Sequence, residues 1–507
     1  MRNNKCIAVE RFAAVRRKGE AREVKDCSPV MRHIGDAGTV INKRGEVHPR
    51  NESANGHFTT TTIRPDALGA VAGQRRGCGG IFGLSKVAFL GNYIPRRCGL
   101  ATFTADLRGA VIERYPDLEC PVVAVNDRPF PYDYPSEVCL EIFEPNLGSY
   151  RLASTFLNLA NVDVLCVQHE FGIFGGVEGS HVLTLLKAVK MPVVTTLHTV
   201  LQDPSSEQRR ILEEVVRLSD RVVVMSRKAA HFLRDIYDVA EERIDIIPHG
   251  IPDFRFVDPD SYKEQCGLAR KRTVFTFGLL SPNKGIENVI NALPQVIAKF
   301  PDVIYVIAGT THPNLVRDRG EEYRLSLEQL VRKRGVENHV MFLNRFVDLQ
   351  ELTELIGAAD IYVTPYLKRE QITSGALSYG IGAGKAIVST PYWHASELLT
   401  DDKGTLVPFD NPDAIARAIN ELLSDEKRRR AMARNAYRMG REMVWSNVAS
   451  LYRRSFEHAL RKAPAAAGNT FTRQAPTLSY NNQSHHLCSG YDDLPGNFST
   501  NGNAATE

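Results

Sequence analysis

The sequence predicts an α/β protein built from two doubly wound parallel-sheet domains that face each other across a cleft. Short apolar runs alternate with amphipathic helical stretches through the middle of the chain, and the alternation starts again after a loop at about 251–271. Runs such as VVAV, VVTT and VVVM are apolar on successive residues, as expected of parallel strands that are buried on both faces. Strands separated by helices imply βαβ units, so each half of the alternation predicts one parallel sheet.

The apolar runs place the expected strands in order along the chain. The first sheet should contain the runs 86–91, 121–126, 163–168, 192–197, 221–225 and 244–247. The second sheet should contain 273–277, 303–308, 340–343, 361–364 and 386–389. Helical stretches fill the gaps. The stretch 207–218, for example, carries one stripe of Ile, Leu and Val, which predicts an amphipathic helix.

The chain is longer than these two sheets require. It has 507 residues, and an ordinary domain has roughly 100–200. We expect a first domain over residues 86–255, a second over 272–442 and a final helix over 443–462. Residues 1–85 and 463–507 lack sustained periodicity and are rich in Gly, Asn, Ser and Thr, which predicts mostly disordered extensions.

The formal net charge of +4 is unevenly distributed. Residues 1–80 carry 15 basic and 8 acidic side chains, whereas the rest of the chain carries 48 and 51. The basic character therefore belongs to the leading segment, and the nearly neutral body argues against a nucleic-acid-binding core. The run Arg16-Arg17-Lys18 is a candidate contact to anionic lipid, with solvated surface charge as the alternative.

Cysteine spacing and hydropathy exclude further classes. The nine cysteines form no C-x-x-C pair, so zinc ribbons and thioredoxin-type redox motifs find no support and no metal site is expected. No run of about 18 apolar residues predicts a transmembrane helix. The first 20 residues lack the apolar core of a secretory signal. We therefore expect a cytoplasmic protein with reduced thiols, at most peripheral to the inner face of the membrane.

The familiar phosphate-binding motifs are missing from the sequence. No G-x-G-x-x-G follows a predicted strand, and Gly384-Lys385 lacks the Ser/Thr and the upstream glycine of a P-loop. A dehydrogenase or a P-loop ATPase is therefore disfavoured. In open parallel sheets ligands bind beyond the carboxyl ends of the strands, so the residues that follow each predicted strand are the candidates for a site.

Polar residues follow three strands of the predicted first sheet. Arg97 and Gly99 stand in the loop after the first strand, where they could cradle an anion or a sugar hydroxyl or form an ordinary βα loop. His169 and Glu170 follow the third strand beside phenylalanines and glycines, a mixture that suits carbohydrate recognition. His198 follows the fourth strand. A lone histidine is usually part of the core, but this one also occupies the end that faces the cleft.

In the second sheet, the first strand leads into Gly278, Asn283 and Lys284, and then into a helix. A lysine at a helix start is unfavourable for the helix dipole, so a phosphate partner explains Lys284 better than a solvated surface position does. Another helix begins at Thr373-Ser374-Gly375. Its free N–H groups and hydroxyls could bind a phosphate, and Thr373 or Ser374 could equally serve as a plain N-cap.

Taken as a set, these segments resemble the retaining GT-B glycosyltransferases of family 4. The resemblance covers roughly residues 86–462 and is carried by Gly278-x5-Lys284-Gly285, by the run from Glu370 to Gly384-Lys385-Ala-Ile-Val-Ser-Thr, and by Gly404-Thr-Leu-Val-Pro-Phe-Asp410. In the first half, the Gly99 loop, His198, Ser226 and Ile247-Pro-His-Gly250 stand at the expected places. Two family residues are missing. The second of two glutamates is replaced by Ser378 or Tyr379, depending on the register, and Leu279 stands where the donor loop usually has an arginine.

The resemblance implies transfer of a hexose, with mannose weakly preferred, from a nucleotide-sugar to a carbohydrate or lipid-linked acceptor. It implies retained anomeric configuration, no essential metal or other cofactor, and a last helix that crosses back to the first domain. His198 and Glu370 would be catalytic, touching the transferred sugar from opposite walls. The donor would be bound by Gly278, Asn283, Lys284, Arg369, Gln371, Thr373, Ser374 and Gly375. The acceptor would be bound by Arg97, Gly99, His169 and Glu170.

Two alternatives remain open at this point. A nucleotide-sugar epimerase would use the same fold without a separate acceptor. A sugar- or nucleotide-binding scaffold without catalysis is motivated by the missing glutamate and arginine. The sequence gives no indication of the oligomeric state.

Overall fold

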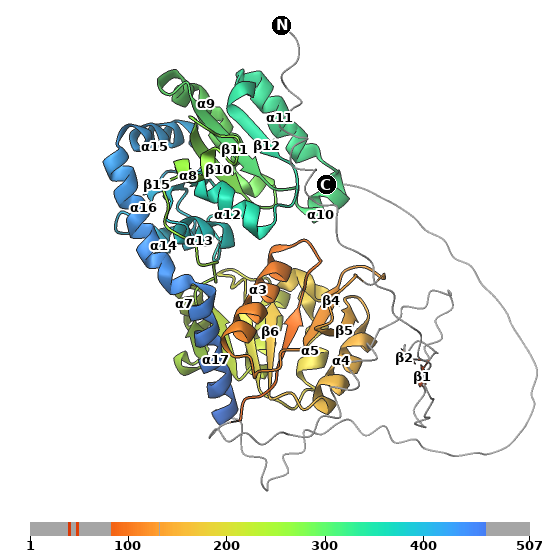
Figure 1. Cartoon of the computed structure of the whole chain (residues 1–507). Helices are drawn as coiled ribbons and strands as arrows, with labels where there is room; N and C mark the ends of the chain where they lie inside the picture. The colour runs from red at the N-terminus through yellow and green to blue at the C-terminus, as the bar shows by residue number, and fades with distance from the viewer. Residues whose placement is uncertain (1–38, 42–46, 50–82, 131, 463–507) are drawn as a thin grey trace, which may run out of the picture. The chain divides into compact units, whose positions relative to one another are not determined.

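The computed structural model describes residues 39–41, 47–49, 83–130 and 132–462 (Figure 1). The predicted extension 463–507 and most of 1–85 lie outside the described residues. Within the leading segment, strands β1 (Thr39–Ile41) and β2 (Val47–Pro49) pair antiparallel. No helix of the described residues is long and apolar enough to cross a membrane.

The first domain contains a seven-stranded sheet in the order β5-β4-β3-β6-β7-β8-β9, in which every pair of neighbours is parallel. The strands are β3 (Val87–Gly91), β4 (Val122–Asn126), β5 (Val138–Phe143), β6 (Val164–His169), β7 (Val193–Leu197), β8 (Arg221–Val224) and β9 (Ile244–Ile246). The α-helices are α3 (Gly99–Arg114), α4 (Leu147–Leu159), α5 (Val182–Leu186), α6 (Ser206–Leu218) and α7 (Arg227–Asp235). Short 3₁₀ turns cover Phe171–Ile173, Val177–Gly179 and Glu241–Arg243.

The second domain contains a six-stranded parallel sheet in the order β12-β11-β10-β13-β14-β15. The strands are β10 (Arg272–Phe277), β11 (Val303–Ala308), β12 (Val340–Leu343), β13 (Ile361–Thr364), β14 (Ala386–Ser389) and β15 (Thr405–Leu406). The α-helices are α8 (Asp260–Lys263), α9 (Ile286–Lys299), α10 (Pro313–Arg319), α11 (Glu322–Arg334), α12 (Leu349–Gly357), α13 (Gly375–Gly382), α14 (Trp393–Leu398), α15 (Pro412–Ser424) and α16 (Glu426–Gly440). Short 3₁₀ turns cover Pro282–Lys284, Glu337–His339 and Arg441–Met443.

The last helix, α17 (Trp445–Lys462), packs on the first domain. Its Tyr452 hydroxyl lies 2.9 Å from the hydroxyl of Thr196 in β7, and the Ser455 hydroxyl donates to Asp245 in β9 at 2.7 Å. Buried apolar residues of this helix share a core with those of β3 and α3. The last described helix is therefore built into the first domain.

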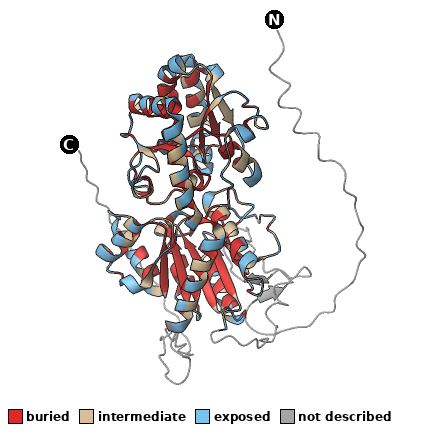
Figure 2. Ribbon diagram, turned by 60° about the vertical axis from the view of Figure 1, so that its left-hand side comes forward, coloured by how far each residue is buried: buried red, intermediate tan, exposed pale blue. Residues whose placement is uncertain are grey.

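These two parallel sheets confirm the predicted fold class. The central strands of both sheets are buried and the edge strands β9, β12 and β15 are more exposed, while the outer faces of the helices are exposed, as Figure 2 shows. Two strands of the domains were not predicted, β5 and the two-residue β15. The sequence of β5 is VCLEIF, whose apolar run is interrupted by Glu141. That carboxylate is buried and accepts a hydrogen bond from the Asn126 amide at 2.6 Å, so a charged residue is accommodated inside the sheet.

Candidate functional site

A cleft of about 650 Å³ is lined by residues that follow the carboxyl ends of strands in both sheets. Nine residues that the sequence singled out lie along it. They are Gly99, Glu170 and His198 from the first domain, and Gly278, Asn283, Lys284, Gln371, Thr373 and Gly375 from the second. The position of the cleft follows the general rule for open parallel sheets, because the loops that follow the strands are the segments free to vary.

His198 presents a neutral imidazole to the cleft. Its Nε2 lies 2.9 Å from the Gln168 side-chain oxygen, and its ring meets the edge of Phe103 at a centroid distance of 4.8 Å. Burial, reinforced by nearby histidines, lowers the pKa of His198 to about 3. Because Gln168 is the acceptor, Nε2 carries the proton and Nδ1 remains an acceptor. A ligand in the cleft therefore meets a polar, uncharged group here.

Lys284 supplies the positive charge of the second domain's wall. It ends the 3₁₀ turn Pro282–Lys284, and its Nζ lies 4.0 Å from the ring centroid of Tyr366. No carboxylate of the described residues pairs with it. The next residue, Gly285, has a φ of 61°, and a Cβ there would lie 2.0 Å from the Pro365 carbonyl oxygen. Only glycine fits this close approach, which fixes the loop against the end of β13.

A buried histidine, His394, accepts a hydrogen bond from the backbone at the start of α13. Ser374 is the N-cap, since its hydroxyl accepts from the Leu377 N–H at 3.2 Å. The Ser374 N–H donates to His394 Nδ1 at 2.9 Å. Burial lowers the pKa of His394 to about 3, which keeps the imidazole neutral and able to accept. Ser374 is thus an N-cap, which is one of the two roles that the sequence predicted for it, while Thr373 and Gly375 line the cleft.

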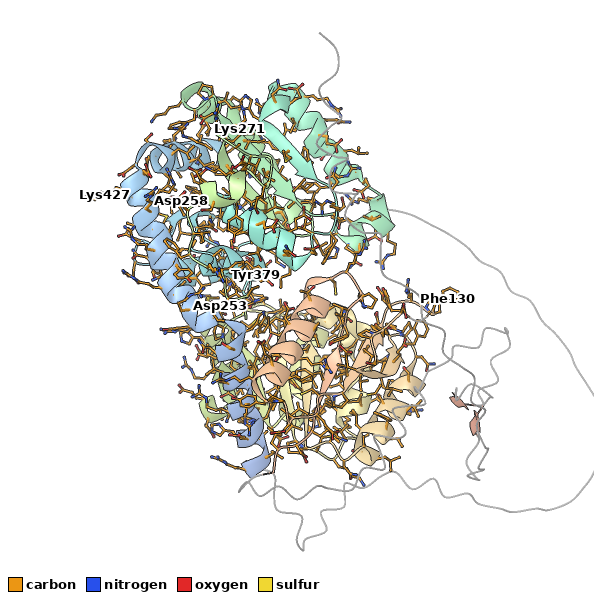
Figure 3. The ribbon with its side chains drawn as sticks, in the orientation of Figure 1. Phe130, Asp253, Asp258, Lys271, Tyr379 and Lys427 are labelled. Atoms are coloured by element: carbon orange, nitrogen blue, oxygen red, sulfur yellow. The ribbon has the colours of Figure 1, made fainter. Side chains whose placement is uncertain are left out.

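Asp106 and Tyr379 join the two domains across the cleft, and the sequence did not single them out as site residues. Asp106 lies on α3, Tyr379 lies on α13, and their side chains share a hydrogen bond (Figure 3 labels Tyr379). Burial raises the pKa of Asp106 to about 6, and the hydrogen bond from Tyr379 opposes that rise. Neither residue follows a strand end, so inspection of strand ends could not find them.

Glu170 lines the cleft, but its carboxylate is already engaged. One oxygen accepts from the Phe171 N–H at 3.0 Å and the other accepts from the Thr199 hydroxyl at 2.6 Å. Burial raises the pKa of Glu170, and both hydrogen bonds oppose that rise. The carboxylate therefore orders the loop after β6 as well as forming part of the wall.

Five predicted residues do not line the cleft. Arg97, Arg369 and Glu370 have exposed side chains, and the Arg369 guanidinium lies 5.7 Å from the Phe409 ring centroid. Ser374 is occupied with capping its helix. His169 is fully buried, 5.4 Å from the Phe171 ring. Side chains alternate between the two faces of a strand, so the residue at the very end of β6 points into the core beneath its own loop.

The part of the chain that the structure describes contains no group of three or more His, Cys, Asp or Glu residues able to hold a metal ion. Lys284 is the single lysine or arginine among the described residues that line the cleft. The carboxylates on its wall are Asp106, Glu170 and Asp348. An anionic ligand would therefore be placed beside Lys284 and away from these three groups.

Two family models match this chain. Residues 260–439 match the family described as Glycosyl transferases group 1, and residues 105–254 match Glycosyltransferase Family 4. The two matches together cover most of both sheets and their cleft. The chain belongs to the family 4 glycosyltransferases, as the resemblance predicted.

Several curated relatives are similar over part of their length. The phosphatidyl-myo-inositol mannosyltransferase of Mycolicibacterium smegmatis is 26% identical over 280 residues, which are 54% of this chain and 66% of the relative. A GDP-mannose-dependent alpha-(1-6)-phosphatidylinositol monomannoside mannosyltransferase of the same organism is 30% identical over 199 residues, 37% of this chain and 48% of the relative. The D-inositol 3-phosphate glycosyltransferase of Corynebacterium glutamicum is 27% identical, covering 52% and 65%. The chain thus spans about half to two thirds of these relatives.

Solved structures share the whole two-domain arrangement. HepE from Anabaena, crystallised with UDP, matches with a TM-score of 0.58 and 19% identity, covering 73% of this chain and 99% of that one. A glycosyltransferase from Rickettsia africae matches with a TM-score of 0.60 and 14% identity, covering 75% and 100%. At these identities the likeness shows the fold, and it confirms the predicted GT-B architecture.

Proposed function

We propose that this protein is a retaining glycosyltransferase that moves a hexose from a nucleotide-sugar to a carbohydrate or lipid-linked acceptor. The observation that carries the proposal is the convergence, in one cleft, of an unpaired lysine and the start of α13 on one wall and a neutral histidine on the other. The lysine and the helix start suit a diphosphate, and the neutral histidine suits sugar hydroxyls. The activities of the curated relatives support the same class of reaction.

In this proposal the donor diphosphate lies against Lys284 and the N–H groups of Thr373 and Gly375, because the Ser374 N–H already donates to His394. As the bond between the anomeric carbon and the phosphate oxygen breaks, negative charge grows on the leaving diphosphate, and these fixed positive groups stabilise it. The acceptor oxygen forms the new bond on the same face of the sugar, and its proton passes to the leaving phosphate oxygen. No metal and no separate general base is assigned. His198 orients the transferred sugar.

Mannose from GDP-mannose is the preferred donor in this proposal, supported by the two mannosyltransferases among the relatives. UDP-sugars are the competing donors, because HepE was crystallised with UDP. A thermal-shift series with GDP, UDP, ADP and their sugars separates these possibilities. A rise in the unfolding temperature with GDP-mannose that exceeds the rise with any UDP-sugar supports the preference, and the reverse order overturns it.

The substitution Lys284→Ala tests the proposed chemistry directly. Loss of one preorganised group that stabilises developing charge costs about 10²–10³-fold in rate, so kcat/KM should fall by about that factor. The matched control is Lys299→Ala, which removes an exposed lysine from the end of the helix that begins one residue after Gly285. If Lys284→Ala retained full transferase activity and full donor affinity, the assignment of the donor site would be wrong.

A scaffold without catalysis is the second candidate, favoured by one observation. In one register Tyr379 stands where the family usually has its second glutamate, and the Tyr379 hydroxyl is hydrogen-bonded to Asp106. Calorimetry and product analysis with a donor and acceptor panel discriminate the two. Tight donor binding without any turnover would favour the scaffold, and an epimerised donor formed without acceptor would indicate an epimerase.

For a lipid-linked acceptor, we place the reaction in the cytoplasm at the inner face of the membrane. The basic leading segment would then supply electrostatic attraction to anionic lipid. A vesicle-binding assay that compares the full chain with one lacking residues 1–80 measures this contribution. Equal binding by both chains would remove the leading segment from the proposal.

A further inference from the structure

A second cavity of about 420 Å³ lies in the second domain at the opposite ends of its strands. Arg272, which begins β10, and Ala386, which begins β14, both line it, as does Asp360, which immediately precedes β13. We call it the amino-end cavity. The cleft residue Gly278 follows the other end of β10. At about 3.3 Å per residue, the six residues of β10 put roughly 20 Å between the two cavities.

The wall of the amino-end cavity carries an excess of positive charge. It contains eight lysines and arginines and five carboxylates. Three of the cations pair with all five carboxylates. The pairs are Lys263 with Asp260 and Asp360 at 2.9 Å each, Arg272 with Asp302 at 2.5 Å, and Arg430 with Asp258 at 3.1 Å and with Glu426 at 2.7 Å. Every acidic group of the wall is therefore engaged, and the excess charge is on the remaining cations.

Five cations of the wall have no carboxylate partner among the described residues. Arg429 donates to the Leu422 carbonyl at 3.0 Å, and Lys385 donates to the Gly357 carbonyl at 2.7 Å. The side chains of the other three, which are Arg270, Lys271 and Arg434, make no hydrogen bond or ion pair with a described residue. Like charges gathered around one hollow repel one another, and an anion inside the hollow would relieve that repulsion.

Lys385 is the deepest of these cations. Its side chain is 3% exposed, and its ammonium group has one carbonyl partner for three N–H donors. Burial lowers the pKa of Lys385 to about 8, an effect that the nearby Asp360 carboxylate opposes. A buried charge is costly unless it is paired and its hydrogen-bond donors are satisfied. The Lys385 ammonium borders a cavity and has N–H donors without a partner among the described residues, and an anion in the cavity would accept hydrogen bonds from them.

We propose that the amino-end cavity binds a phosphate-bearing anion, separately from the sugar-donor cleft. Arginine offers a planar pair of donors that matches the oxygen atoms of a phosphate, and lysine offers a compact charge, so this wall has the chemistry for a phosphate group. The volume admits a group of the size of a sugar phosphate or a phospholipid headgroup. Such a site goes beyond the proposed transfer reaction and does not depend on it.

The test uses two variants of the full chain with equal net charge. The cavity variant is Lys271→Gln/Arg434→Gln, and the control variant is Lys427→Gln/Arg438→Gln. Lys427 and Arg438 are exposed on α16 and do not line the cavity; Figure 3 labels Lys271 and Lys427. The cleft is identical in both variants, so any difference between them reports the amino-end cavity alone.

Calorimetric titration with inorganic pyrophosphate measures the affinity of each variant. Because charge-assisted hydrogen bonds are among the stronger polar contacts, the cavity variant should bind at least about tenfold more weakly than the control variant. A second assay measures cosedimentation of both variants with phosphatidylglycerol vesicles and with phosphatidylcholine vesicles. If the cavity variant cosediments less than the control variant with phosphatidylglycerol vesicles, and the two variants bind pyrophosphate equally, the phosphate belongs to a lipid headgroup. A difference with pyrophosphate alone assigns it to a free phosphorylated metabolite, and equal behaviour in both assays overturns the proposal.

Discussion

The substitution His169→Phe tests whether this histidine belongs to the core or to the site. His169 is fully buried at the end of β6, and neither of its ring nitrogens has a hydrogen-bond partner among the described residues. Its neighbours are the rings of Phe171 at 5.4 Å and Phe174 at 6.0 Å, measured between centroids. A third phenyl ring would therefore replace an imidazole whose polar atoms gain nothing from their surroundings.

The expected effect has a neutral-pH part and an acid part. A buried polar group without a partner costs about 1–3 kcal/mol, so the variant should be more stable by about that amount at pH 7.5. Burial also lowers the pKa of His169 to about 4 from an ordinary value of 6.5. The unfolded wild-type chain therefore takes up a proton below pH 6.5 while the folded chain does not, and wild-type stability falls between pH 6.5 and about 4. One pKa unit is 1.36 kcal/mol, so the loss at pH 5 is about 2 kcal/mol.

Urea unfolding at pH 7.5 and at pH 5 measures both parts. The stability of His169→Phe relative to wild type should be positive at pH 7.5 and should grow by about 2 kcal/mol at pH 5. His169→Leu, which is smaller, guards against overpacking and should show the same growth. The control His458→Phe changes an exposed histidine of α17 and should show neither effect. A relative stability that does not change with pH, or a large loss of acceptor affinity at unchanged stability, would refute a core role.

Two further substitutions probe the walls of the cleft. Gly375→Ala would place a Cβ 2.7 Å from His249 Nε2, so one of the two residues must shift. A displacement of about 1 Å near a site lowers the reaction rate by about 10²-fold, so we expect a loss of that size in kcat/KM for the donor. Steady-state kinetics measures the loss, and an unchanged circular dichroism spectrum shows that the variant is folded. Tyr379→Phe removes the hydrogen bond that holds down the pKa of Asp106, so that pKa should rise above about 6 in a carboxyl NMR titration, and an unchanged titration would show that the two side chains do not interact in solution.

The fold could be predicted from the sequence because parallel strands buried on both faces leave a continuous apolar signal. The run VVAV became part of β4, and VVTT became part of β7. The same criterion missed β5, where Glu141 interrupts the run but finds an amide partner within the sheet. A polar residue inside a strand is tolerated when a neighbouring strand supplies its hydrogen bond, and a single sequence does not show which strands will be neighbours.

The site could be predicted only where its residues are close together in the chain. Lys284 and Gly375 stand within short segments whose spacing and helix starts are visible in the sequence. Asp106 and His394 act through partners that the fold brings together, because Asp106 meets a tyrosine of the other domain and His394 accepts the N–H of a residue 20 positions earlier. His169 was misplaced by one position of strand alternation, since its neighbour Gln168 points the other way and contacts the histidine of the cleft.

The electrostatics of the cleft make its dependence on Lys284 unusually direct. His198 and His249 both line the cleft, and burial lowers the pKa of each to about 3 and about 4, so neither is charged at neutral pH. Arg97 and Arg369, which were predicted to add positive charge to the site, are exposed and do not line the cleft. Among the described residues, a diphosphate in the cleft thus has one full positive charge and one helix start to oppose it. Because no second lysine or arginine of the described residues lines the wall, replacing Lys284 should not be compensated locally, and the two neutral histidines add no positive charge of their own.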